Sequence, residues 1–153
     1  MKYLLPGICL VVLSNCFSAS AQNSIPVNEP DQNKPKLFSA LPDKIPVDIS
    51  TLQSLVSAET GKTVSLRMTA NGMSQFTGQV VSKADDNSFH SVVIRSGNFN
   101  GATLTLSSSA QPNGAVKFTG RIISLQHSDV YELQYQNDQY MLIKKNFYDL
   151  INE

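Results

Sequence analysis

Short runs of alternating apolar and polar residues fill the chain from residue 64 to residue 144, and they limit what it can fold into. In the first run Val64, Leu66 and Met68 alternate with polar residues, which is the period of a strand with one buried face. Six similar runs follow, at 76–83, 90–96, 102–107, 116–125, 130–136 and 139–144. The turns between them are too short for parallel crossovers. The sequence therefore predicts about seven antiparallel strands, each paired with its sequence neighbour.

A seven-residue segment occurs twice within these runs. Residues 76–82 (FTGQVVS) return as residues 118–124 (FTGRIIS), with four identities and two exchanges of Val for Ile. The residues before the two copies also correspond. They are 38 positions apart, as in Leu66 and Leu104, whereas the copies themselves are 42 positions apart. This difference predicts a loop that is four residues longer in the second copy. We therefore predict a mainly β fold with two three-stranded repeats plus a closing strand. They would form a single antiparallel meander sheet or a small barrel.

Glycine occupies the third position of both copies, on the same strand face as the aromatic residue two positions earlier. The pairs are Phe76 with Gly78 and Phe118 with Gly120. Glycine inside a strand weakens it, so its presence twice indicates a structural repeat with a bend, a bulge or a close backbone approach. The alternative is that the glycines leave room for a ligand inside a barrel.

Two short helices are predicted at the ends of the β-region. Over 49–58, apolar residues at i, i+3 and i+4 from Leu52 lie on one helical face, and Asp48 stands at the N-cap position. A short C-terminal helix is predicted over 146–151, where its apolar residues would pack on an open end of the sheet.

The first 21 residues have the three parts of a cleavable signal peptide. These are the positive Lys2, an apolar run, and the cleavage pattern Ala19-Ser20-Ala21. The alternative is a lipoprotein signal, in which Cys16 would be the lipid anchor, although Asn15 is not the small residue usual before that cysteine. We therefore expect an exported, periplasmic or extracellular protein, which would contact a membrane only through a lipid on Cys16.

Residues 22–47 have the composition of a Pro-rich flexible lead-in. They hold five prolines among Asn, Gln, Asp and Lys, a composition that is too polar to bury itself. Leu37, Phe38 and Leu41 are the exception and are suited to docking on the following domain. The predicted organisation is a signal peptide at 1–21, the lead-in at 22–47 and a β-domain at 48–153.

The composition excludes several classes of function. Cys9 and Cys16 both lie within the signal, so cleavage after Ala21 leaves no thiol for a disulfide, a nucleophile or a metal site. The remaining 11 basic and 12 acidic residues are mixed, which argues against nucleic-acid binding. No catalytic, cofactor-binding or metal-binding motif is present, so we assign no such residues and no cofactor.

The only two histidines, His90 and His127, lack metal-ligand spacing. The run His127-Ser128-Asp129 contains the residue types of a hydrolase triad, but adjacent residues of a turn point in different directions and cannot form its hydrogen-bond chain. A metal-assisted hydrolase using both histidines is kept as a second alternative.

Three tyrosines offer a candidate binding surface. Tyr131 and Tyr135 share one strand face, and Tyr140 lies on the next strand. Tyrosine suits protein interfaces because its ring contributes area and its hydroxyl a directional bond; the alternative is that these rings face the core. The sequence favours an exported non-catalytic binding or interaction module with a protein partner, such as an inhibitor. The first alternative is a small-ligand carrier with an open β-barrel.

Overall fold

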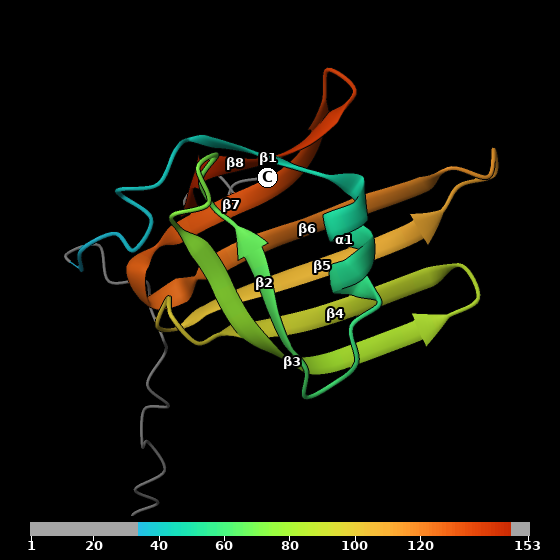
Figure 1. Cartoon of the computed structure of the whole chain (residues 1–153), viewed down its shortest axis with the longest axis horizontal. Coiled ribbons are helices and arrows are strands. Elements are labelled where there is room, and N and C mark those ends of the chain that lie inside the picture. The colour runs from blue at the N-terminus through green and yellow to red at the C-terminus, as the bar shows by residue number, and fades with distance from the viewer. Residues whose placement is uncertain (1–33, 148–153) are drawn as a thin grey trace, which may run out of the picture.

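All seven predicted runs form strands, and an eighth strand joins them at one edge. The computed structural model describes residues 34–147. The strands are β1 (Lys44–Val47), β2 (Thr63–Arg67), β3 (Gln75–Asp86), β4 (Phe89–Ser96), β5 (Ala102–Ala110), β6 (Val116–Ser124), β7 (Asp129–Gln136) and β8 (Gln139–Asn146). They form one antiparallel sheet in the order β1-β8-β7-β6-β5-β4-β3-β2, which curls into a half-barrel around a short helix (Figure 1). The mainly β class and the pairing of sequence neighbours are confirmed.

The eighth strand, β1, lies inside the segment that the composition assigned to the lead-in. Its four residues pair with β8, with Lys44 opposite Ile143 and Val47 opposite Tyr140. The sheet therefore has one strand more than the predicted seven, and this strand precedes Asp48. Four residues that include Pro46 are too few to show an alternating pattern, and their pairing depends on a strand about 100 residues away.

The helix α1 (Ile49–Val56) lies in the concave face of the sheet and packs against β4 and β5 (Figure 1). Leu52, Leu55 and Val56 are buried, as the apolar stripe predicts. Asp48 occupies the N-cap position with extended backbone, but its side chain makes no capping hydrogen bond. The predicted helix is thus confirmed, with an earlier end and without the expected cap.

Residues 36–43 cover one end of the concave face. Phe38 is fully buried, and its ring centroid lies 5.4 Å from that of Phe99 and 5.3 Å from that of Tyr131. The carboxylate of Asp129 accepts a hydrogen bond from the backbone N–H of Phe38 at 3.4 Å. This part of the predicted lead-in therefore belongs to the folded domain.

The two predicted repeats are the meanders β2–β4 and β5–β7, and β8 follows them. Phe76 lies opposite Leu66, and Phe118 lies opposite Ser108, so the two hairpins have equivalent registers. Leu66 thus corresponds to Ser108, at the same offset of 42 as the two copies, and the second hairpin contains no inserted residues. The strand β5 is nonetheless longer than β2, with nine residues against five. The loop after β5 (111–115) is shorter than the loop after β2 (68–74). The predicted longer loop is therefore wrong, because the strand pairing keeps one offset of 42 through the whole hairpin and leaves no insertion.

Gly78 and Gly120 each lie where a neighbouring backbone comes close. A Cβ on Gly78 would lie 2.5 Å from the carbonyl oxygen of Arg95, and one on Gly120 would lie 2.7 Å from that of Thr105. A β-bulge follows Val80 in the β3–β4 ladder. The close approach expected from the repeat is present at both sites. The space beside each glycine is filled by backbone, which leaves none there for a ligand.

Several predictions concern residues outside the described range. They include the signal peptide at 1–21, Cys16, the lead-in residues 22–33 and the part of the C-terminal helix beyond Phe147. Phe147 itself follows β8 and is buried. Within residues 34–147, no helix has the length and apolar character needed to cross a membrane.

Candidate binding surfaces

The three tyrosines predicted to form a binding surface do not lie together on the surface. Tyr131 is fully buried, and its hydroxyl donates to the carbonyl oxygen of Pro42 at 2.5 Å. Tyr140 is also buried, and its hydroxyl accepts from the backbone N–H of Phe118 at 3.0 Å. Tyr135 alone is exposed, at 57 %, beside the Tyr140 ring. The alternative, that the rings face the core, is therefore correct for Tyr131 and Tyr140.

The environment of Tyr131 keeps its phenol neutral. Burial raises the pKa of this group well above its ordinary value, and the nearby carboxylates of Asp43 and Asp129 act in the same direction. The hydroxyl therefore acts as a structural donor to the segment before β1.

The two histidines lie at opposite ends of the strands. His90 is level with Ser108 and Phe118 in the sheet, whereas His127 follows the far end of β6. The six steps along the strand from Phe118 to Ser124 span about 20 Å. A shared metal ion is therefore not supported. Within residues 34–147 there is no group of three or more His, Cys, Asp or Glu side chains that could hold a metal.

Each histidine instead has a local partner. His90 Nδ1 lies 2.9 Å from Asp85 Oδ1, and His127 Nδ1 lies 2.8 Å from the carbonyl oxygen of Pro35. The hydrogen bond from His90, followed by that from Lys83, lowers the pKa of Asp85. This cluster at the β3–β4 hairpin is exposed, with both the His90 and Asp85 side chains about half accessible, and it resembles a solvated surface network more than a catalytic site.

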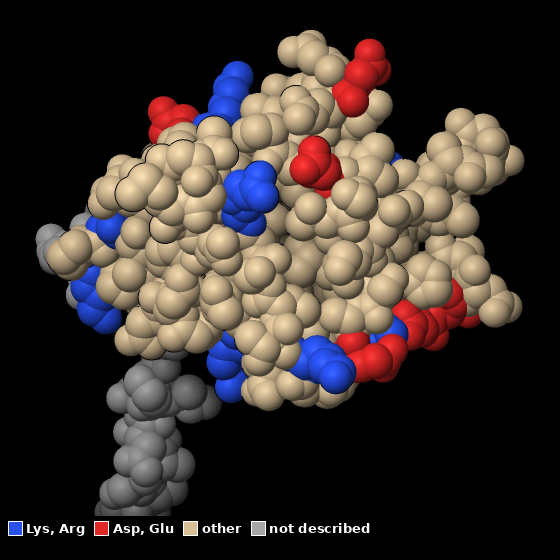
Figure 2. Space-filling model, in the orientation of Figure 1, with Lys and Arg blue, Asp and Glu red and all other residues tan. Residues whose placement is uncertain are grey.

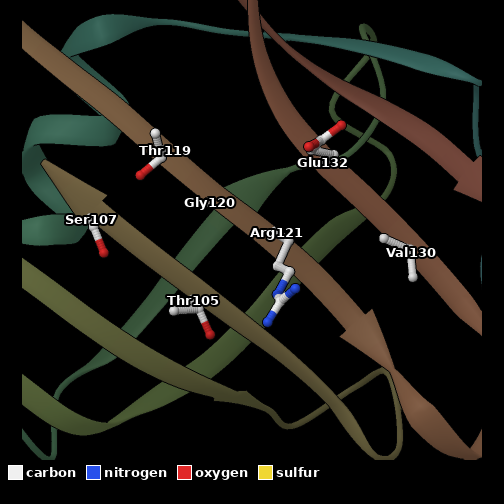
Figure 3. A pocket seen from close by; sticks show the side chains of 7 residues that line it. All are labelled: Thr105, Ser107, Thr119, Gly120, Arg121, Val130 and Glu132. Carbon is white, nitrogen blue, oxygen red and sulfur yellow. The ribbon is translucent and has the colours of Figure 1, made fainter. Parts of the chain in front are cut away.

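A hollow of about 220 Å³ lies on the outer face of the sheet (Figure 3). The lining residues are Thr105, Ser107, Thr119, Gly120, Arg121, Val130 and Glu132. Arg121 and Glu132 are cross-strand partners, but the Arg121 side chain extends over Thr105 and that of Glu132 points away (Figure 3). Glu132 contacts Gln134 and Lys145 instead.

In this outer hollow a ligand could form hydrogen bonds only to side chains and not to the backbone. It lies over β5, β6 and β7, which are interior strands with a bonded neighbour on each side, so their backbone groups are already paired. Three small hydroxyl side chains and one exposed guanidinium are typical of a solvated sheet face.

A groove lies away from the outer hollow, between β2, α1 and β1. It consists of two adjoining hollows of about 190 and 440 Å³ that share Thr51 and Ser65. The lining residues are Pro46, Val47, Asp48, Ser50, Thr51, Ser54, Leu55, Thr63, Val64, Ser65, Leu66, Arg67 and Gln75. Because β1 and β2 line the same hollow, the groove lies between the two edge strands of the sheet. We call this feature the β2 groove.

The surface around the β2 groove carries little charge. On the face shown in Figure 2, one basic and one acidic side chain lie near its upper part, and the other charges lie around the outline, with the acidic ones densest along the lower right edge near β3. The groove walls carry hydroxyl groups of Ser50, Thr51 and Ser54, and the buried Leu55 and Leu66 lie at its base. Hydroxyl and apolar groups suit a neutral ligand that forms hydrogen bonds.

The β2 groove was missed in the sequence because alternation identifies a strand but not its neighbours. One pattern did point to it: the first strand of a meander has no preceding strand to pair with. Comparison of the chain with known protein families, curated proteins and solved structures finds no match.

Proposed function

We propose that this chain is an exported, non-catalytic binding module that engages another exported protein through the β2 groove. The observation that carries the proposal is the groove itself, an open and largely uncharged channel between two edge strands. Export rests on the signal peptide in the sequence.

The interior of the half-barrel supports a binding surface over a ligand carrier. A carrier needs an inner face that is partly empty. Here the concave face is covered by Leu52 and Leu55 of α1 and by Phe38, all of which are buried. A small ligand inside the sheet would have to displace these side chains.

Capture of a partner by groove variants tests the proposal. The mature chain, residues 22–153, would be immobilised and exposed to the exported protein fraction of its source cells. Thr51→Arg places a long charged side chain in the groove, and Thr105→Arg makes the same change in the outer hollow. We expect a specific partner whose capture falls at least tenfold with Thr51→Arg and stays within twofold with Thr105→Arg, while both variants keep the wild-type circular dichroism spectrum. Equal capture by both variants, or no specific capture by the wild type, would contradict the proposal.

A further inference from the structure

The free edge of β2 presents backbone groups that have no partner in the sheet. Met68 N–H bonds to Ser74 and Val80 N–H bonds to Lys62, at 2.8 and 2.9 Å. In an antiparallel ladder the bonded residues alternate. The even-numbered residues of β2 therefore bond to β3, while the N–H and C=O groups of Thr63, Ser65 and Arg67 point away from it. Within residues 34–147, no hydrogen bond satisfies these outward groups.

The other edge of the sheet is blocked. Lys144 N–H bonds to Asp43 C=O at 2.8 Å, so the same alternation directs Lys44 and Pro46 of β1 away from β8. Proline has no N–H, and proline on an edge strand is a common protection against added strands. β2 contains no proline and no bulge, and its only charged residue is the terminal Arg67.

We propose that the β2 groove binds a single extended segment of a partner protein, which adds to the edge of β2 as a further antiparallel or parallel strand. This inference rests on the proposed function and specifies how the partner is recognised. A row of alternating backbone donors and acceptors is matched along its length by another extended backbone, and strand addition to a free edge is a general mode of peptide recognition.

The groove walls define which side chains the segment would carry. Val64 and Leu66 face the interior, and Leu55 of α1 lies beside them. Thr63, Ser65 and Arg67 face outward and are exposed. Because side chains alternate along a strand, the segment would place apolar residues toward Leu55 and polar residues toward solvent.

The space beside β2 favours one strand over a second copy of the chain. Pro46 and Val47 of β1 and Ser65 and Leu66 of β2 line the same hollow. A second copy pairing through its own β2 would bring its β3 into the space that β1 and α1 occupy. The chain's own residues 22–33 contain Pro26 and Pro30, each of which lacks a backbone donor. An extended segment of another protein therefore fits best.

A proline substitution tests this inference directly. Ser65→Pro removes one outward N–H without removing a bond to β3, whereas the matched Ser65→Val keeps the N–H and changes only the side chain. Peptides would be selected from a random 12-residue phage-displayed library on the mature chain, and the best would be synthesised. We expect an alternating apolar–polar pattern, at least tenfold weaker binding to Ser65→Pro, and binding to Ser65→Val within threefold of wild type.

Hydrogen exchange and N-methylated peptides locate the contact on the unmodified protein and do not depend on the folding of Ser65→Pro. Peptide binding should slow amide exchange at Thr63, Ser65 and Arg67 far more than at Val64 and Leu66. N-methylation should abolish binding only at alternate peptide positions, because only every second N–H of the peptide would face β2.

Several outcomes would overturn strand addition. They are the selection of no peptide, unchanged exchange at Ser65, and equal binding of the peptide to folded Ser65→Pro and to wild type. Binding of a synthetic peptide of residues 22–33 with the same dependence on Ser65 would assign the groove to the chain's own lead-in instead. If Ser65→Pro keeps the captured partner that Thr51→Arg loses, the proposed function stands and strand addition fails.

Discussion

At the scale of single residues, the two repeated glycines are required because the neighbouring backbone leaves no room for a side chain. A Cβ on Gly78 or Gly120 would overlap a neighbouring backbone carbonyl, and the buried Phe76 and Phe118 precede them on the same face. The sequence repeat therefore marks two places where strands approach more closely than a side chain permits.

Substitution of these glycines by alanine should destabilise the fold. We expect Gly78→Ala and Gly120→Ala each to lower the free energy of unfolding by about 1–3 kcal/mol, because the backbone must move to admit a methyl group. Gly97→Ala is the matched control, since its Cβ would lie 3.7 Å from the nearest atom, and it should change stability by less than about 0.5 kcal/mol. Urea unfolding of the three variants measures the effect. Equal effects at all three sites would contradict the packing role.

The buried phenol of Tyr131 predicts a dependence of stability on alkaline pH. Its pKa in the folded protein lies above its unfolded value of about 10, so the unfolded chain ionises first. The stabilisation from the neutral phenol is present below pH 10 and is lost as the pH rises through the folded pKa. Tyr131→Phe should cost about 1–3 kcal/mol at pH 7, because the hydrogen bond to Pro42 is lost.

The difference between wild type and Tyr131→Phe should therefore shrink from pH 9 to pH 11. Urea unfolding at several pH values measures it. A difference that stays constant over this range would show that Tyr131 ionises equally in both states.

At the scale of elements, the segment before α1 is what the sequence described least well. Polar composition and five prolines predicted a flexible lead-in through Val47, with Phe38 among the residues suited to docking. Phe38 is buried as expected, but β1 also pairs with β8, which the composition did not predict. Composition averages over a window, whereas docking here depends on one aromatic ring and four paired residues. In contrast, the seven longer strands and α1 were predictable, because each repeats its period several times.

Truncation separates the docked part of this segment from the residues before it. A chain that begins at Lys34 should unfold at the same urea concentration as residues 22–153. A chain that begins at Asp48 loses β1 and Phe38 and should be strongly destabilised, since removal of a buried Phe side chain alone costs about 3–5 kcal/mol. Equal midpoints for the two truncated chains would show that residues 34–47 do not stabilise the domain.

At the scale of the whole molecule, one core joins every element. The buried cluster includes Phe38, Leu52 of α1, Leu66 of β2 and Leu142 of β8, which come from both ends of the described chain. Because these side chains share contacts, no element can leave the core without exposing part of the others.

The shared core predicts a single cooperative unfolding transition. The far-ultraviolet circular dichroism and the tyrosine fluorescence of residues 22–153 should follow the same thermal curve, and Phe38→Ala should shift both curves equally. The chain has no tryptophan, so the fluorescence reports on tyrosines, among them the buried Tyr131 and Tyr140. A separate, earlier fluorescence transition would show that the end closed by Phe38 unfolds independently.

The sequence by itself determined the local features of this protein: the strand periods, the short turns that make neighbours antiparallel, the apolar stripe of α1 and the repeated glycines. These depend on residues close together in the chain. Only the tertiary structure decided that β1 pairs with β8, that Tyr131 and Tyr140 face the core, and that β2 is left with a free edge in a groove. Each depends on which distant segments meet when the sheet curls, and a local period of two carries no information about that.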